Sequence, residues 1–416
     1  VAPGSRADYG LLKPLIEKIT IESRFTLQLL VTGAHLSPEF GLTYRQIEKD
    51  GYTIDAKVEM LLSSDTPVGI TKSMGVGLIG LADAFSRLQP DLLVILGDRY
   101  EMLSTATAAL IFRIPIAHIH GGEITEGAYD DAIRHAITKM SALHFTSTEV
   151  YRRRVIQLGE PSDRVFNVGA IGLDNFKTLV PLTREELEKE LNIEFRKYNY
   201  LVSYHPETAT AAEERKQKTE YKAGESKRET ELLEVEKGQE TEYTTSENIQ
   251  EAINELLKAI SIQTDSLFIF TKAGADTNGR IINQKIEAFV AKHPHTTALF
   301  DSLGTKRYLS LMQQATAVVG NSSSGILEAP SAHTATINIG NRQKGRIQAG
   351  SIINCRTDST SIASAFEKVR VPSFRAKLES LDNPYGDGTA SEQIIRILKE
   401  TDFRTLLQKS FNDLNS

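Results

Sequence analysis

Residues 91–98 have the sequence DLLVILGD, in which the apolar run Leu92–Leu96 ends at a glycine and an acid. A continuous apolar run of this length is typical of a strand that is buried on both faces of a parallel sheet. Similar runs alternate with helical patterns, which predicts an α/β fold whose helices cover a parallel sheet. In the first half we expect strands at Phe25–Thr32, Asp91–Leu96, Pro115–His120, Leu143–Thr146 and Arg164–Val168, and helices that include Leu11–Ile21, Gly77–Leu88 and Tyr129–Met140.

The second half of the chain repeats this alternation. A Val-Pro-Leu-Thr linker at 180–183 leads into the charged helical stretch Arg184–Leu191, which indicates a domain boundary nearby. The expected strands are Tyr200–His205, Ser266–Thr271, Thr297–Asp301, Ala317–Gly320 and Thr336–Gly340. We therefore expect two doubly wound, Rossmann-like domains, 1–178 and 179–370, and C-terminal helices in 371–416 that pack back on the first domain.

One segment departs from this pattern. Glu207–Glu247 contains 19 charged residues in 41, of which 12 are acidic and 7 are basic. Such a composition buries too little apolar surface to offset the entropy of ordering the chain. We expect a flexible or solvated helical insertion, and a functional arm is the alternative.

The composition excludes several classes of function. A net charge of −6 and a pI near 5.9 provide no basic surface for nucleic acid. The single Cys355 forms no internal disulfide, and we see neither a signal peptide nor an apolar run of the roughly 20 residues that a membrane span needs. We therefore expect a cytoplasmic protein without membrane contact. The chain begins at Val1 with what looks like a shortened strand, so we expect residues to be missing before it.

Residues 75–80, GVGLIG, match the G-x-G-x-x-G pattern of dinucleotide-binding loops. That pattern binds a pyrophosphate only where it directly follows a strand. The preceding residues, 67–74, do not resemble a strand. We interpret the glycines as a loop that opens a packed helix, and not as a nicotinamide site.

A stronger anion-binding pattern lies at 317–328, AVVGNSSSGILE. An apolar strand leads into a small polar loop and then a helix, which presents backbone N–H groups to an anion. Ser322 and Ser323 add donors, Gly325 allows close approach, and Glu328 could accept from ribose hydroxyls. An ordinary helix cap is the alternative. Arg342 and Arg346 follow the next strand and supply charge, so together the segments favour a nucleotide diphosphate.

Acids and histidines are concentrated between residues 98 and 144. Asp98 follows a strand, at the edge where open α/β sheets bind ligands. His118 and His120 end the next strand and, two residues apart, should share a face; Glu123 follows them. Asp130 and Asp131 begin a helix in which Arg134 and His135 lie four residues further on. A salt-bridge network or an H-x-H metal site would explain the pattern, but acid–base chemistry by carboxylates fits better.

Two residues at strand ends complete the candidate site. Arg6 follows the shortened strand expected at the start of the chain, and His205 ends the first strand of the second domain. Both would face the same crevice if the domains face each other across a cleft.

These motifs resemble the hydrolysing UDP-N-acetylglucosamine 2-epimerases of sialic acid biosynthesis, over almost the whole chain. The resemblance implies two Rossmann-like domains in the GT-B arrangement, with the nucleotide sugar between them. The matching stretches are GSRADYG at 4–10, TGAHLSPEFG at 32–41, GDRYE at 97–101, HIHGGEITEGAYDDAIRHAITK at 118–139, VGAIGLDN at 168–175, SLG at 302–304, GNSSSGILEAPS at 320–331 and NIGNRQKGR at 338–346.

The resemblance also implies a reaction. UDP-GlcNAc would lose its C2 proton and then UDP, and water would add to the glycal to give N-acetylmannosamine, without a cofactor or metal. It assigns the acid–base roles to Asp98, Asp130 and Asp131, and a further role to either His120 or Glu123, since many members have Glu where this chain has His120. The implied substrate contacts are Arg6, His205, Asp276, Ser322, Ser323, Glu328 and Arg342.

Alternatives remain within and outside this family. They are the same chemistry on a UDP-diacetamido-trideoxyglucose, a non-hydrolysing 2-epimerase, a glycosyltransferase of the same fold and a nucleotide-sugar-binding protein without catalysis. We expect a homodimer or homotetramer.

Overall fold

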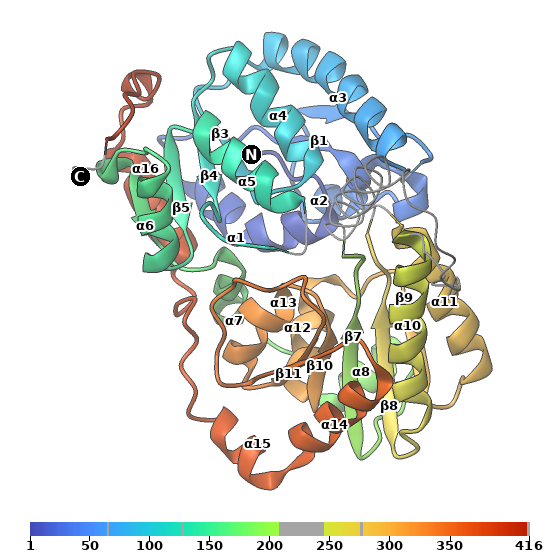
Figure 1. Ribbon diagram of the computed structural model, residues 1–416. Coiled ribbons are helices and arrows are strands. Elements are labelled where there is room, and N and C mark those ends of the chain that lie inside the picture. The colour runs from blue at the N-terminus through green and yellow to red at the C-terminus, as the bar shows by residue number, and fades with distance from the viewer. Residues whose placement is uncertain (65, 127–128, 208–244, 275–277, 414–416) are drawn as a thin grey trace, which may run out of the picture.

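The computed structural model describes residues 1–64, 66–126, 129–207, 245–274 and 278–413. Most of the predicted insertion 207–247 lies outside these ranges, as does Asp276. The protein consists of two α/β halves that meet along the middle of the molecule, and the C-terminal segment returns from the second half to the first (Figure 1).

The first half contains a parallel sheet. Its strands are β1 (Leu30–Thr32), β2 (Ala56–Val58), β3 (Leu93–Leu96), β4 (Ile116–Ile119), β5 (Leu143–Thr146) and β6 (Val165–Asn167). β1 pairs with β2, and β3 to β6 pair in sequence order. The N-terminal residues join the two groups, because Ala2 N donates to Val94 O at 3.1 Å and Leu30 N donates to Val1 O at 3.1 Å.

Helices cover both faces of this sheet. They are α1 (Arg6–Ile21), α2 (Tyr44–Lys49), α3 (Pro67–Leu88), α4 (Tyr100–Ile111), α5 (Asp130–Met140), α6 (Glu149–Gln157) and the short α7 (Asp174–Thr178). Val94 and Leu96 pack with α1, whereas Leu93 and Ile95 pack on the opposite side with α3 and α4. Because alternate residues of a strand face opposite sides, the run Leu92–Leu96 has to be apolar throughout.

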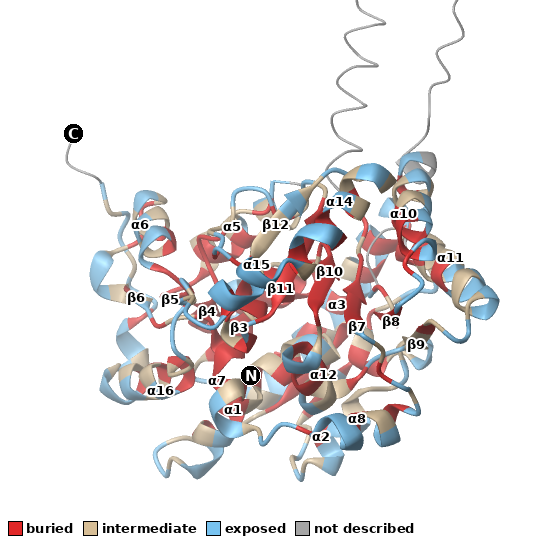
Figure 2. Ribbon diagram, turned by 90° about the horizontal axis from the view of Figure 1, so that it is seen from below, coloured by how far each residue is buried: buried red, intermediate tan, exposed pale blue. Residues whose placement is uncertain are grey.

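The second half has a six-stranded parallel sheet in the order β12-β11-β10-β7-β8-β9. The strands are β7 (Tyr198–Ser203), β8 (Ser266–Thr271), β9 (Thr297–Phe300), β10 (Ala317–Gly320), β11 (Ala335–Ile339) and β12 (Ile352–Cys355). The helices that follow residue 178 in the chain are α8 (Arg184–Leu191), α10 (Thr245–Ser261), α11 (Gly279–Lys292), α12 (Gly304–Gln314), α13 (Ser324–Leu327), α14 (Ser359–Arg370), α15 (Pro372–Leu378) and α16 (Ala390–Glu400). The strands are buried and the outer helix faces are exposed (Figure 2).

Most of the predicted strands and helices are confirmed, with three differences in the sheets. The first strand covers only Leu30–Thr32 of the predicted Phe25–Thr32, and β2 and β12 were not predicted. Each of the missed strands lies at a sheet edge and is short, and β12 is only partly buried. Edge strands carry less apolar signal than central ones, which explains why the pattern did not reveal them.

The prediction that residues 75–80 form a loop was wrong. These glycines lie within α3, which begins at Pro67, and they do not form a loop that opens a helix. A Cβ on Gly77 would lie 3.1 Å from Met60 Cε, and one on Gly80 would lie 2.8 Å from Val58 Cγ1. The glycines therefore let α3 pack closely on β2 and the residues that follow it.

The expectation about apolar runs also needs correction. By length and composition, α3 is a helix that could cross a membrane. Its residues Leu81, Ala84 and Phe85 are buried in the core of the first half, and a core helix passes the same test.

The C-terminal residues divide between the two halves. Phe374 and Leu378 of α15 pack into the second-half core, whereas Ile394 and Leu398 of α16 join the core that α1 forms. The prediction that the helices of 371–416 pack on the first half therefore holds for α16 and not for α15. We propose two domains that divide near residue 178.

A buried carboxylate holds the C-terminal segment on the first half. The side chain of Glu160 is 0% exposed and hydrogen-bonds with His144 Nε2 at 2.9 Å, Lys139 Nζ at 2.6 Å and Lys409 Nζ at 2.8 Å. Burial opposes ionisation, but the bonds from His144, Lys139 and Lys409 outweigh it and lower the pKa of Glu160 to about 2.

A carboxyl whose pKa is lowered on folding stabilises the protein above its unfolded pKa, and this contribution disappears as the pH falls through the folded value. Glu160→Gln should therefore lower the free energy of unfolding by roughly 3 kcal/mol at pH 7, and by much less near pH 2. Urea unfolding at several pH values measures this. Glu149→Gln, which removes an exposed partner of Arg152 and Arg153, is the control and should change stability by less than about 0.5 kcal/mol. An equal loss at every pH would contradict this account.

Candidate active site

A buried guanidinium organises the acids of the first half. Arg134 of α5 is 1% exposed, and its Nη1 donates to Glu123 O at 2.9 Å and to Asp131 Oδ1 at 3.2 Å. Its Nη2 donates to Thr125 Oγ1 at 2.6 Å and to Asp98 Oδ2. Burial, followed by the charges of nearby arginines, lowers the pKa of Arg134. The structure thus brings Asp98, Asp131 and the backbone of Glu123 around one side chain.

The helix start that carries the paired acids differs in detail from the prediction. Asp131 Oδ2 lies 3.6 Å from His135 Nε2, which confirms that pair, and Asp131 Oδ1 accepts from Thr125 N at 2.6 Å. Arg134 stands four residues after Asp130, and it forms an ion pair with Asp131, three residues before it. Both separations place side chains on one helix face, so spacing alone did not decide between them. Asp130 is half-buried at the first residue of α5.

Glu123 and His120 form a second cluster beside Arg134. Glu123 is 1% exposed; its Oε1 accepts from Ser147 Oγ at 2.8 Å and lies 3.3 Å from His120 Nδ1. His120 Nε2 accepts from Ile171 N at 3.2 Å, which assigns the ring proton to Nδ1. Burial lowers the pKa of His120, which favours a neutral ring whose Nδ1 faces Glu123.

The two histidines of the H-x-H pattern make separate contacts. His118 Nε2 hydrogen-bonds with Gly97 O at 2.8 Å, and its Nδ1 lies 3.2 Å from Thr138 Oγ1. The expectation that both rings share a face assumed an extended backbone through residue 120, but β4 ends at Ile119 and His120 has φ of 66°. Among the described residues, no group of three or more His, Cys, Asp or Glu gathers as metal ligands would.

The loop after β10 is organised by Asn321, which is 0% exposed. Its Oδ1 accepts from His205 N at 2.7 Å, and its Nδ2 donates to His205 O at 2.8 Å. The backbone carbonyl oxygen of Asn321 accepts from Arg342 Nη1 at 3.3 Å and from Gln343 Nε2 at 2.7 Å. One asparagine therefore joins the ends of β7, β10 and β11, and brings together His205, Ser322 and Arg342.

One detail of the predicted anion loop is corrected, and Gly325 is found to have a role in packing. The helix that follows Ser322 and Ser323 is α13, a single turn, so it provides little macrodipole. Gly325 serves packing, because a Cβ there would lie 2.8 Å from Thr336 Cγ2. The half-buried Ser322 and Ser323 and their backbone N–H groups remain as donors.

Glu328 and Arg6 lie where the halves approach each other. Burial raises the pKa of Glu328 to about 7, and a Cβ on Gly172 of the first half would lie 2.9 Å from Glu328 Oε1. Burial, and then the charge of Arg307 on α12, lower the pKa of Arg6 to about 10. Arg6 therefore lies close to the second half. Glu123 also lies at the junction of the two halves, because its Oε2 is 2.9 Å from Arg346 Nη2 of the second half.

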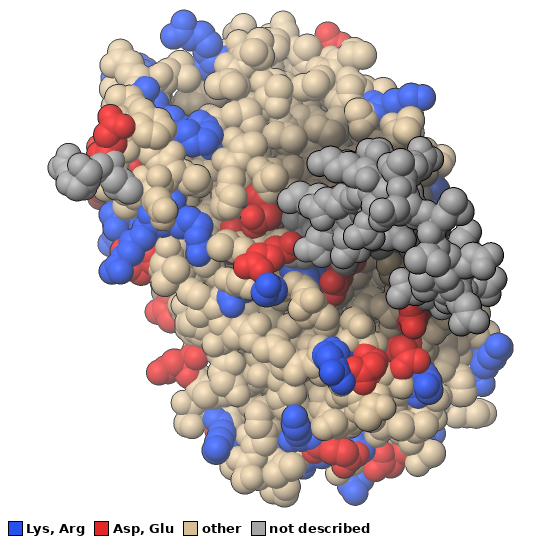
Figure 3. All heavy atoms as spheres, viewed as in Figure 1, with Lys and Arg blue, Asp and Glu red and all other residues tan. Residues whose placement is uncertain are grey.

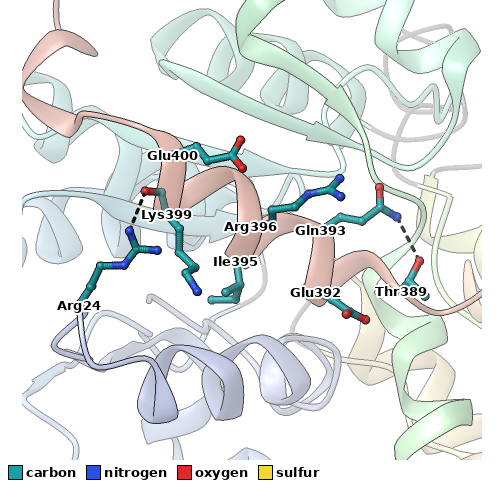
Figure 4. Close-up of a pocket in the computed structure, with 8 residues that line it drawn as sticks. All are labelled: Arg24, Thr389, Glu392, Gln393, Ile395, Arg396, Lys399 and Glu400. Atoms are coloured by element: carbon teal, nitrogen blue, oxygen red, sulfur yellow. Dashed lines mark hydrogen bonds between the residues drawn. The ribbon is translucent and has the colours of Figure 1, made fainter.

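Figure 3 shows acidic and basic side chains side by side at the level where the two halves meet. A surface hollow elsewhere, between the end of α1 and α16, contains no predicted site residue (Figure 4). That hollow is lined by Arg24, Thr389, Glu392, Gln393, Ile395, Arg396, Lys399 and Glu400.

Sequence reasoning missed three residues of this arrangement. Arg134 was named only as a helical neighbour, and Asn321 and Ser147 were not singled out. A buried polar side chain that hydrogen-bonds to several loops at once leaves no periodic pattern in the sequence. Asn321 stands within a polar loop and Ser147 directly after β5, and this position at a strand end was the available clue.

The fold and the sequence can be compared with known proteins. The structure of UDP-GlcNAc 2-epimerase from Neisseria meningitidis bound to UDP-GlcNAc superposes with a TM-score of 0.73 at 17% identity, covering 96% of this chain and 99% of that chain. A Methanocaldococcus jannaschii UDP-GlcNAc 2-epimerase in complex with UDP-GlcNAc and UDP gives a TM-score of 0.73 at 18% identity, covering 96% and 99%. This chain therefore has the predicted GT-B-like fold of two Rossmann-like halves.

A family model described as UDP-N-acetylglucosamine 2-epimerase matches residues 17–233 and 240–399. A GDP/UDP-N,N'-diacetylbacillosamine 2-epimerase (hydrolyzing) from Campylobacter jejuni is 41% identical, covering 100% of this chain and 98% of that protein. Polysialic acid biosynthesis protein P7 from Escherichia coli is 35% identical, covering 99% and 95%. The chain belongs to the UDP-N-acetylglucosamine 2-epimerase family, and its resemblance to the hydrolysing branch is confirmed.

Asp98→Asn should lower the rate of UDP release from a UDP-sugar by about 10²–10⁴, because a carboxylate beside Arg134 loses its ability to exchange protons. UDP affinity should stay within about threefold, since all the predicted nucleotide contacts except Arg6 lie in the other half. Asp91→Asn is a matched control, because Asp91 lies exposed before β3 whereas Asp98 lies after it. Normal turnover in Asp98→Asn would remove this residue from the site.

Proposed function

We propose that this protein is a hydrolysing 2-epimerase that converts a UDP-2-acetamido sugar into the free 2-epimeric sugar and UDP. The observation that carries the proposal is the cluster around Arg134. It holds Asp98 and Asp131 next to Glu123, on the junction that also carries Arg342 and the loop of Ser322 and Ser323. Carboxylates for proton transfer and donors for a diphosphate therefore lie on opposite sides of one junction.

The chemistry uses these groups in two stages. In the first, a carboxylate takes the proton from C2, the C1–O bond breaks, and UDP leaves with the bonding electrons, so that a 1,2-glycal remains. In the second, water adds its hydroxyl group to C1, and a proton reaches C2 from the other face. Asp98, Asp130, Asp131 and Glu123 are the candidates for these proton transfers, and His120 orients Glu123.

The nucleotide contacts have a separate task. Arg6, His205, Ser322, Ser323, Glu328 and Arg342 would hold the nucleotide and its diphosphate, with Asp276 as a further candidate outside the described residues. Charge-assisted bonds to phosphate stabilise the departing UDP. Glu328 would accept hydrogen bonds from ribose hydroxyls in its ionised form.

For the sugar, we propose a 2,4-diacetamido-trideoxy compound as the preferred substrate and UDP-GlcNAc as the second candidate. The order follows the relatives: the one at 41% identity is named for N,N'-diacetylbacillosamine, and the one at 35% for polysialic acid. The sequence alone had favoured UDP-GlcNAc. Either product belongs to the biosynthesis of a sialic-type acid, and we expect it to form in the cytoplasm.

An NMR time course in deuterium oxide tests the reaction. We expect free UDP and a free 2-epimeric sugar that carries deuterium at C2, with kcat/KM at least about tenfold higher for the diacetamido substrate than for UDP-GlcNAc. Measuring kcat/KM for the GDP and UDP derivatives of the diacetamido sugar compares the two nucleotides.

Each alternative predicts a different result. Accumulation of the epimeric UDP-sugar would show a non-hydrolysing epimerase. UDP release only with an added sugar acceptor would show a glycosyltransferase, and UDP binding without any release would show a binding protein. A higher kcat/KM with UDP-GlcNAc would reverse the order of the two substrates.

We also propose that the protein forms a homodimer through the outer face of α3. Val76 and Ile79 of this helix are 41% and 72% exposed, and Ile111, at the end of the adjacent α4, is 76% exposed. Lys72 and Asp83 lie at equal distances on either side of these α3 residues, and neither has an ion-pair partner within the described chain. A two-fold axis through the middle of this face would place α3 antiparallel to its copy in the other chain. Lys72 would then pair with Asp83 of that chain.

Ile79→Asp should convert the dimer to a monomer, which light scattering after size exclusion measures. Ile21→Asp, at an 81% exposed position of α1, is the matched control and should leave the mass unchanged. Lys72→Glu should weaken the dimer, and adding Asp83→Lys should restore it. A wild-type monomer, or no response to Ile79→Asp, would contradict the proposed face.

A further inference from the structure

The loop that follows β11 touches the loop that follows β4. Arg346 Nη2 lies 2.9 Å from Glu123 Oε2, with side chains that are 6% and 2% exposed. Lys344 Nζ lies 3.0 Å from Glu126 Oε2 in the same pair of loops, but these side chains are 66% and 48% exposed. These two loops, one from each half, are therefore joined to each other by one buried ion pair and one exposed ion pair.

The buried pair leaves Arg346 dependent on Glu123. Arg346 Nε and Nη1 are buried and have no hydrogen-bond acceptor within the described residues. Among the ion pairs of the described residues, Glu123 supplies the one negative charge that contacts this guanidinium. Arg342, four residues earlier, instead bonds to the backbone of Asn321 in the nucleotide loop.

Glu123 receives its other contacts from the first half. Ser147 and His120 occupy its Oε1, so Arg346 is the group that fixes its Oε2. A carboxylate that transfers a proton has to be held within a fraction of an ångström of its reacting geometry. The arrangement of Arg346 fits this task better than the diphosphate contact that its sequence position suggested.

We propose that Arg346 is a positioning residue that reaches from the nucleotide-binding half and holds Glu123 in its reacting orientation. The proposal rests on the proposed function, in which Glu123 is one of the acid–base groups. It assigns different tasks to the two arginines of one loop: Arg342 contacts the diphosphate and Arg346 acts through Glu123.

A double-mutant cycle separates these tasks. Glu123→Gln and Arg346→Gln should each lower kcat by about 10² or more, and the double variant should lose no more than about threefold beyond the worse single variant. UDP affinity, measured by calorimetry, should stay within about threefold in Arg346→Gln. Arg342→Ala should weaken UDP binding by about tenfold or more.

Two further variants complete the design. Lys344→Gln removes the exposed ion pair of the same loops and should retain kcat within about twofold. Arg346→Lys keeps the charge and should recover at least about tenfold of the kcat lost in Arg346→Gln. If Arg346→Gln does not fold, Arg346→Lys decides: lowered kcat with normal UDP affinity supports positioning, and weakened UDP affinity with normal kcat overturns it.

The proposal is overturned if Arg346→Gln weakens UDP binding as much as Arg342→Ala does, because Arg346 would then contact the diphosphate. It is also overturned if the losses of the two single variants multiply in the double variant. A wild-type protein that releases no UDP from any UDP-sugar would instead refute the proposed function, so the two failures are distinguishable.

Discussion

The buried guanidinium of Arg134 imposes the constraint on which the site depends. A charged group without water needs anions and acceptors around it, because leaving it unpaired costs several kcal/mol. Asp98, Asp131, Thr125 and the carbonyl of Glu123 meet that need. The loops after β3 and β4 and the start of α5 are therefore tied to one another, and the acids lie close together without any ligand.

In the second half, the uncharged side chain and backbone of Asn321 connect several loops in the same way. Asn321 hydrogen-bonds with the backbone of His205 and accepts from Arg342 and Gln343, so that three strand ends are held together at the proposed nucleotide site. The Arg346–Glu123 ion pair then connects the loop after β11 to the acids around Arg134. A nucleotide sugar bound at the junction would place its diphosphate in one half and its sugar ring in the other, which is the division of labour that the proposed elimination requires.

Sequence patterns predicted the architecture because apolar runs such as Leu92–Leu96 report burial directly. They also placed Asp98, His205 and Arg342 at strand ends and Asp131 at the start of a helix, close to the junction of the two halves. They failed where tertiary packing decides: Gly77 and Gly325 serve close packing, His120 turns out of its strand, and Asn321 gives no periodic signal. Whether Arg346 contacts phosphate or Glu123 depends on a contact between distant loops, which spacing within one loop does not contain.

The central claim is that the reaction breaks the C1–O bond of the sugar by elimination beside the Arg134 cluster. Hydrolysis in ¹⁸O-labelled water, followed by mass spectrometry of the released UDP, tests it most directly. If water adds to a glycal, the β-phosphate of UDP contains no ¹⁸O. One ¹⁸O atom in that phosphate would show that water attacks phosphorus, and would contradict the account.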